Sequence, residues 1–347
     1  MLKLVDMEIT KQDIKFIVLF ILILLGKFLS AQDSFFSNHH TTSLYNNPIN
    51  TGLSKNDWRF INNYRCQWKS FGEPYNSYFT GYDRQFYLYN ENISSGLFFI
   101  RETSGSNNYY SNNISASLAY HKEIKNDTYH IGIQAGYLQK GINNNNMTLP
   151  DQFDMSSGYF NPEFATDDEI IRSKMSAYVF NVGLGFSKKF NGKEFTIGYS
   201  YHNINIPVSS FINLDYTIFK KNALFIESKI GLSTKFYLTP YIYSATQQSS
   251  NQTTIGTSIG YIYKHDQLKD YDITGGVYLR TGRLKFNESI VLSAGVEVSN
   301  FLVGINYDIG ISKIARMVGL KNALELSFIW KGIYSNINKS KNKCVRF

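Results

Sequence analysis

Residues 129–137 read Tyr-His-Ile-Gly-Ile-Gln-Ala-Gly-Tyr, and this stretch indicates the fold class of the whole chain. Every second residue is apolar or aromatic, and the residues between them are His, Gly, Gln and Gly. A helix would spread these apolar residues around its circumference, whereas an extended strand places them all on one face. The same alternation recurs at 178–187, 253–263 and 301–310. The sequence therefore predicts an all-β protein.

The second face of these strands consists mainly of Gly, Ser, Asn and Thr rather than Lys and Glu. Small polar residues suit the interior of a membrane barrel whose lumen is partly filled or watery. Aromatic residues make up 16% of the chain and charged residues only 18%, below the roughly 25% charge of soluble domains. The mean hydropathy of −0.25 is too polar for a bundle of membrane helices. Together these features predict a transmembrane antiparallel outer-membrane β-barrel.

Counting the alternating segments gives about 14 strands, and an even number is what single-chain bacterial barrels use. Several predicted strands have about ten residues, enough to cross a bilayer at a tilt. The barrel is predicted to span 57–334, with strands near 59–70, 77–89, 95–102, 111–122, 128–140, 176–190, 194–202, 223–233, 237–245, 252–264, 271–280, 289–299, 302–310 and 323–334.

The N-terminal residues 1–31 have the pattern of a secretory signal peptide. Lys11 and Lys15 precede the apolar run 16–25, and small residues follow it up to Ala31. A charged region, an apolar core and a small-residue cleavage site direct export, and the apolar run is shorter than the roughly 20 residues that span a bilayer. Residues 32–56 are expected to form a loop segment before the barrel, and 335–347 a polar, basic tail.

The longest irregular region between predicted strands is 141–175. A second irregular stretch, about 203–222, contains Pro207. A long loop in a compact fold is usually functional or disordered. Short turns of such barrels normally face the periplasm, so we expect the loop 141–175 to be extracellular.

No motif predicts catalysis, a metal or a cofactor. The G-x-S-x-G match at 256–260 lies inside an alternating strand, without the strand-to-helix elbow that exposes a nucleophilic serine. The six histidines and two cysteines show no ligand spacing, and the acidic residues 167–169 lack the glycine-punctuated EF-hand pattern. The net charge of +8 is scattered rather than gathered in a nucleic-acid-binding stripe. We therefore expect neither an enzyme nor a nucleic-acid-binding protein.

Short motifs at both ends of the chain resemble the PorP/SprF family of barrels associated with the type IX secretion system. The segments 32–37 and 45–52 resemble the family's opening Q-D…F-S and N-P-A-x-x-G-like elements, although Ile49 and Asn50 replace small residues. Residues 64–68 resemble its Y-R-x-Q-W motif, and 72–74 its G-x-P motif. Residues 303–308 and 323–327 resemble its closing strands.

The resemblance singles out a set of residues as a partner-binding or structural motif. Pro48 fixes φ and Gly52 permits a positive φ, so residues 47–52 are expected to form a rigid turn entering the barrel. Strand parity points Arg65 toward the lumen or a partner, and Trp68 toward the lipid interface. The complete set is Asn47, Pro48, Gly52, Tyr64, Arg65, Gln67, Trp68, Gly72 and Pro74.

The resemblance implies an accessory outer-membrane barrel of the type IX secretion and gliding system. Such a barrel supports the export or surface attachment of large adhesin-like proteins by protein–protein docking. Its partners would be outer-membrane lipid, a secreted adhesin-like client and periplasmic components of the machine. A polar lumen is also compatible with a passive channel or small-molecule transporter, and this alternative stays open.

Overall fold

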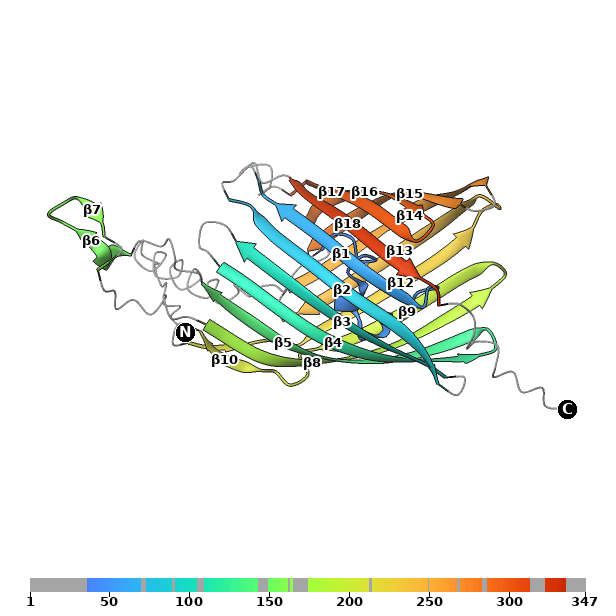
Figure 1. Cartoon of the computed structure of the whole chain (residues 1–347), viewed down its shortest axis with the longest axis horizontal. Helices are drawn as coiled ribbons and strands as arrows, with labels where there is room; N and C mark the ends of the chain where they lie inside the picture. Colours follow the sequence, from blue (N-terminus) through green and yellow to red (C-terminus); the bar gives the residue numbers. More distant parts are fainter. Residues whose placement is uncertain are drawn as a thin grey trace, which may run out of the picture.

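In the computed structural model, fourteen strands close into a single antiparallel barrel (Figure 1). This confirms the predicted all-β outer-membrane barrel and its strand number. The structure describes residues 36–69, 73–88, 91–104, 109–142, 149–161, 163–164, 174–211, 214–248, 250–266, 269–282, 286–312 and 322–334. The predicted signal peptide and the tail 335–347 lie outside these residues. No helix in the described ranges is long and apolar enough to span a membrane.

Most barrel strands extend the predicted segments by a few residues, because cross-strand hydrogen bonds continue into residues that break the apolar alternation. The predicted segments 59–70, 223–233 and 323–334 instead run two or three residues past the ends of the observed strands. The strands are β1 (Trp58–Gln67), β2 (Tyr75–Leu88), β3 (Glu91–Ser104), β4 (Tyr109–Ile124), β5 (Asp127–Ile142), β8 (Lys174–Phe190), β9 (Lys193–His202), β12 (Lys221–Gly231), β13 (Phe236–Gln247), β14 (Ser250–Asp266), β15 (Lys269–Gly282), β16 (Phe286–Val298), β17 (Phe301–Gly310) and β18 (Asn322–Gly332).

Pairing of β1 with β18 closes the barrel. The register runs from Trp58 opposite Gly332 to Gln67 opposite Ala323. Closure matters because a hydrocarbon environment offers no water to an unpaired sheet edge. Two small sheets lie outside the barrel wall: β6 (Phe153–Asp154) with β7 (Tyr159–Phe160), and β10 (Val208–Phe211) with β11 (Leu214–Thr217). Each sheet falls in one of the two regions that the sequence predicts to be irregular: β6 and β7 in 141–175, and β10 and β11 in 203–222.

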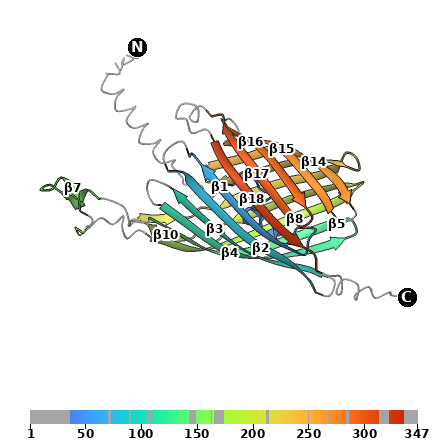
Figure 2. The same cartoon turned by 45° about the horizontal axis from the view of Figure 1, so that its top comes forward.

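The two ends of the barrel differ in the length of their connections (Figures 1 and 2). At one end, residues 125–126 join β4 to β5 and residues 191–192 join β8 to β9. At the other end, 143–173 connect β5 to β8 and 203–220 connect β9 to β12. We call these the short-turn end and the long-loop end. Because the strand number is even, β1 begins and β18 finishes at the same, short-turn end.

The outward face of the strands is apolar, with aromatic pairs near both ends. Along β5, residues 129, 131, 133 and 135 are exposed, and residues 130, 132, 134 and 136 are buried. The rings of Tyr129 and Phe186 pair at 5.4 Å near the short-turn end, and those of Tyr137 and Tyr178 pair at 5.4 Å near the long-loop end. Two aromatic girdles around an apolar band are typical of outer-membrane barrels.

A charge placed in the middle of this apolar band should destabilise the barrel in the membrane. Ile133 is 54% exposed near the centre of β5, so we expect Ile133→Arg to lower the free energy of unfolding by about 2–4 kcal/mol. The matched control is Tyr129→Arg on the same face of β5, at the girdle, where the expected cost is about 0–1 kcal/mol. Urea unfolding in lipid vesicles measures both, and equal costs would contradict the assigned lipid face.

Candidate functional site

Residues 36–57, which we call the plug, lie inside the barrel. The plug contains one short helix, α2 (Ser43–Asn46), followed by a 3-10 turn, η2 (Pro48–Asn50). Leu44, Ile49 and Thr51 are fully buried. The sequence predicts residues 32–56 as a loop segment before the barrel, and the described part of this segment occupies the lumen. Residues 32–35 lie outside the described ranges.

The plug runs through the lumen from the long-loop end to the short-turn end. Ser37 contacts Arg65 and Asp308, which lie near the long-loop ends of β1 and β17. At the opposite end, the amide of Asp57 donates to the carbonyl of Gly332 at 2.9 Å. The chain then reverses and begins β1. Phe36 and the C-terminal end of β18 therefore lie at opposite ends of the barrel.

A buried cluster of two guanidinium and two carboxylate groups holds the start of the plug. Arg65 on β1 pairs with Asp308 at 2.9 Å and with Glu325 at 3.4 Å. Arg280 on β15 pairs with the same oxygen of Asp308 at 2.7 Å. We call these four residues the latch. Its charges sum to zero, and removing one member of such a buried group typically costs about 3–5 kcal/mol because the partner charge is left uncompensated.

The plug adds several hydrogen bonds to the latch. The backbone N–H of Ser37 donates to one carboxylate oxygen of Glu325 at 2.7 Å, and that of Asn38 to the other at 3.1 Å. The hydroxyl of Ser37 donates to Asp308 at 2.7 Å and accepts from Arg65 and Arg280. Charge-assisted bonds of this kind are about twice as strong as neutral ones. The latch is therefore a polypeptide-binding site built from four strands.

A second polar group on the wall binds the end of the plug. Gln85 donates through its amide nitrogen to the carbonyls of Gly52 at 2.7 Å, Ser54 at 2.6 Å and Asn56 at 2.9 Å. Asp83 accepts from the amide of Gly52 at 2.7 Å. Gly52 has φ +70°, and a side chain there would lie 2.0 Å from the hydroxyl of Ser94. Both the backbone conformation and the close approach require glycine at this position.

Glycines on the inner wall receive the turn at Pro48 and Ile49. Gly132 on β5 and Gly183 on β8 face each other in the register. A Cβ at Gly132 would lie 2.6 Å from the carbonyl carbon of Pro48, and one at Gly183 would lie 2.2 Å from Asn47 Oδ1. The small inward face of these strands is therefore fitted to the plug rather than to an open watery lumen.

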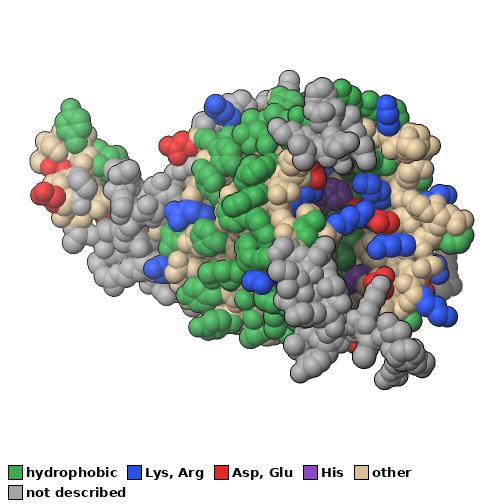
Figure 3. Space-filling view, turned by 45° about the vertical axis from the view of Figure 1, so that its right-hand side comes forward, with side chains coloured by type: hydrophobic (Ala, Val, Ile, Leu, Met, Phe, Trp, Pro, Cys, Tyr) green, Lys and Arg blue, Asp and Glu red, His purple; other side chains and the backbone are tan. Residues whose placement is uncertain are grey.

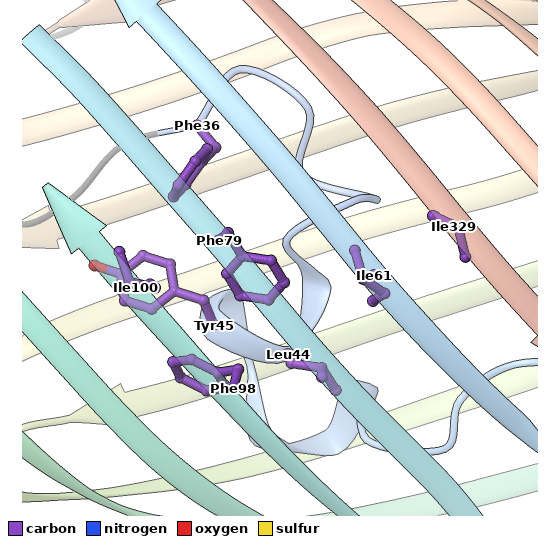
Figure 4. Packing of buried hydrophobic residues seen from close by; sticks show 8 residues of the cluster. All are labelled: Phe36, Leu44, Tyr45, Ile61, Phe79, Phe98, Ile100 and Ile329. Atoms are coloured by element: carbon purple, nitrogen blue, oxygen red, sulfur yellow. The ribbon is translucent and has the colours of Figure 1, made fainter.

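Apolar side chains of the plug pack on two sides of the lumen. Phe36, Leu44 and Tyr45 form one cluster with side chains from β1, β2, β3 and β18 (Figure 4). Ile49 belongs to a second cluster, with Phe225 and other residues of β12, β13, β15 and β16. The wall members of the first cluster are Ile61, Phe79, Phe98, Ile100 and Ile329.

Near the short-turn end, two wall histidines link the plug to the barrel through a chain of hydrogen bonds. His121 Nε2 lies 2.8 Å from the carbonyl of Thr51 and must donate to it. With neutral rings, His121 Nδ1 then accepts from His130 Nδ1 at 2.7 Å, and His130 Nε2 accepts from the hydroxyl of Ser187 at 2.8 Å. Figure 3 shows a hollow at this end, with histidine and charged side chains inside it.

The described ranges contain no group of three or more His, Cys, Asp or Glu residues that could hold a metal ion. Cys66 is a free cysteine in β1. Cys344 lies outside the described residues.

Several of the sequence-predicted site residues meet in the lumen. Asn47, Pro48 and Gly52 belong to the plug: the side chain of Asn47 accepts from the amide of Ile49 at 3.0 Å, and Pro48 opens the 3-10 turn. Arg65 points inward and is 1% exposed, at the centre of the latch.

The remaining predicted residues lie apart from the plug. Tyr64 faces outward, and its hydroxyl donates to Asn76 at 2.9 Å. Trp68 is exposed with φ 62°, directly after Gln67, the last residue of β1. Pro74 precedes β2, and Gly72 lies outside the described residues.

Sequence reasoning missed the partners of these residues on the wall. Asp83, Arg280, Asp308 and Glu325 are inward-facing charges on β2, β15, β17 and β18. A charged residue at a lumen position of an alternating strand is the signal that could have identified each of them.

The fold and the site together define an outer-membrane β-barrel whose lumen is occupied by its own N-terminal segment. More specifically, the chain belongs to the PorP/SprF family: the model of the type IX secretion system membrane protein PorP/SprF matches residues 28–330. The predicted resemblance is thereby confirmed, and the protein is placed in the outer membrane.

Solved barrels with similar architecture have very different sequences. The Pseudomonas putida toluene transporter TodX is 11% identical, with a TM-score of 0.47, over 88% of this chain and 96% of that one. CdiB from Acinetobacter baumannii is 8% identical, with a TM-score of 0.45, over 79% of this chain and 60% of that one. Among curated proteins, none matches the sequence. The family assignment therefore depends on the family model alone.

Removing the charge of Glu325 should loosen the start of the plug. Hydrogen bonds to a charged group are worth about 1.5–3 kcal/mol, so Glu325→Gln is expected to speed amide hydrogen exchange at Ser37 and Asn38 by about 10–100-fold. The control is Glu297→Gln, whose carboxylate pairs with Lys331 at 2.6 Å at the short-turn end. Unchanged exchange at Ser37 in the Glu325 variant would contradict the latch.

Acidification should also weaken docking of the plug, through His39. Burial is the main cause that lowers the pKa of His39 from 6.5 to about 3. The nearby His40, Arg280 and Arg65 lower this pKa further, and Asp308 partly opposes them. A released plug binds a proton at its ordinary pKa, so docking is fully stable above pH 6.5 and loses stability as the pH falls toward 3. Between pH 7.5 and 5 the expected loss is about 2 kcal/mol.

Hydrogen exchange of residues 36–45, corrected for intrinsic rates, measures this loss. The variant His39→Gln keeps a polar side chain and removes the titrating group, so its pH dependence should be flatter than that of the parent. Equal pH dependence in the two proteins would show that His39 does not titrate on release of the plug.

Proposed function

We propose that the protein is an accessory barrel of the type IX secretion and gliding system, which supports export or surface attachment of large adhesin-like proteins by docking them. The observation that carries this proposal is the family match over residues 28–330. The long loops at one end support it because they offer surfaces to which proteins can bind. The occupied lumen supports it because the plug obstructs a path for solutes. We propose no catalytic step.

The plug argues against the alternative of a passive channel. Residues 36–57 run the length of the lumen, and polar and apolar contacts on the wall fix them at both ends and in the middle. An open channel would gain nothing from a buried ionic latch, because burying its charges costs desolvation energy that ion pairing only offsets. The docking function needs no open lumen.

The short-turn end offers a surface to periplasmic components. Lys125, Lys189, Lys193 and Lys235 are exposed in or beside adjacent turns at this end. Short turns normally face the periplasm. We propose that periplasmic parts of the secretion machine contact this basic edge.

Deleting the gene and comparing the surface and secreted proteomes of mutant and parent tests the proposal. We expect one or a few very large surface proteins to be lost from the cell surface, and to return when the gene is restored. The matched control is restoration with Tyr129→Arg, which changes the outer wall alone. An unchanged proteome would contradict the proposal, and conductance of the purified barrel in planar bilayers would then decide the channel alternative.

A further inference from the structure

The loop hairpin, described at residues 149–161 and 163–164, carries the most exposed apolar side chains among the described residues outside the barrel wall. It comprises the 3-10 turn η3 (Pro150–Gln152), β6 and β7. It stands away from the barrel beyond the long-loop end (Figures 1 and 2). Met155 is 92% exposed and Tyr159 is 76% exposed, far more than the lipid-facing residues of β5. Phe153, Phe160 and Phe164 are exposed as well.

The backbone of the loop hairpin is held by its own hydrogen bonds. The backbone carbonyl of Asp154 accepts a hydrogen bond from the amide of Gly158 at 2.8 Å. The side-chain carboxylate of Asp154 accepts one from the amide of Ser156 at 2.8 Å. The side chain of Gln152 donates to the carbonyl of Phe164 at 3.1 Å, which ties the two ends together. A binding surface that is ordered before it meets its partner loses less entropy on binding.

Among the described residues of the loop hairpin, the rings of Phe153 and Phe160 pack on each other, with centroids 5.1 Å apart. Met155 and Tyr159 stay largely exposed. Large exposed apolar patches on otherwise water-facing surfaces usually mark interaction sites. Aromatic residues and methionine are also the apolar types enriched in protein interfaces.

Charge selects among the possible occupants of this surface. The stretch 149–164 contains Asp151, Asp154 and Glu163 and no Lys or Arg, in a chain whose net charge is +8. Three carboxylates disfavour the phosphate-rich surface of lipopolysaccharide, and they disfavour the same hairpin of a second copy. A protein segment with apolar side chains flanked by Lys or Arg fits both the charge and the exposed rings.

We propose that the loop hairpin is the docking surface for a basic, apolar segment of the exported client protein. This inference rests on the function proposed above. It assigns recognition of the client to the extracellular side, whereas the plug keeps the lumen occupied. Met155 and Tyr159 provide the apolar anchors, and the carboxylates of Asp151 and Glu163 steer the basic segment onto them.

Three variants in the chromosomal gene test this inference. The first, Met155→Ser with Tyr159→Ser, removes the apolar anchors. The second, Asp151→Lys with Glu163→Lys, reverses two charges and keeps the apolar anchors. The matched control is Leu184→Ser, which removes a 57% exposed leucine from the lipid face of β8. Heat-modifiable gel migration confirms that each barrel is folded in the outer membrane.

The readout is the surface amount of the proteins that disappear when the gene is deleted. We expect both hairpin variants to lower this amount at least about tenfold and to release the proteins into the medium, since anchor residues dominate binding. The control should keep the parental amount. A photo-crosslinking amino acid in place of Tyr159 should join one of the same proteins in intact cells, and added salt should weaken this crosslink.

The other outcomes overturn the inference in distinguishable ways. Gene deletion that removes the surface proteins, together with hairpin variants that keep them, would reject the docking surface and leave the proposed function intact. Equal loss in the Leu184 control, or crosslinks only to lipopolysaccharide or to a second copy, would also reject it. Gene deletion without any change in the proteome would reject the proposed function and the docking surface together.

Discussion

An irregular segment inside a membrane barrel must find a hydrogen-bond partner for each buried backbone group, and this constraint governs the lumen. Residues 36–57 do not pair as a strand with the wall. Turns within the segment satisfy some of its backbone groups, as in the bond from the amide of Tyr45 to the carbonyl of Thr42, and side chains of the wall supply partners for others. Glu325 accepts from two consecutive amides, and the amide group of Gln85 donates to three carbonyls. These polar contacts require inward-facing charges at fixed heights in several strands. The closed register of β1 and β18 holds those strands in place.

The same constraint explains why the wall is not uniform. Where the plug turns at Pro48, the wall is reduced to glycine at positions such as Gly132 and Gly183, because any side chain would collide with it. Where the plug presents Leu44 and Phe36, the wall carries Phe79 and Ile61. A barrel built in this way is committed to a polypeptide in its lumen.

The alternation of apolar residues was sufficient to predict the fourteen strands, because the lipid face depends on local sequence alone. The plug was not predictable, since residues 36–57 follow neither a helical nor a strand period and depend on distant wall residues. The pair of Arg65 with Asp308 joins residues on β1 and β17, which only barrel closure brings together. Phe98, Phe99 and Ile100 carry one local signal of the plug that the sequence prediction did not use. Consecutive apolar residues place apolar side chains on both faces of the strand, and those on the inner face indicate packing inside the lumen.

A disulfide crosslink between plug and wall tests the occupied lumen most directly. The hydroxyl oxygens of Thr51 and Ser117 lie 2.7 Å apart. In a background of Cys66→Ser and Cys344→Ser, the pair Thr51→Cys and Ser117→Cys should form a bond in native outer membranes, seen as a joined peptide by mass spectrometry. The pair Thr51→Cys and Ser289→Cys, with Ser289 near the long-loop end, should not. Absence of the first crosslink in a folded barrel, or equal yields from both pairs, would contradict a plug threaded through the lumen.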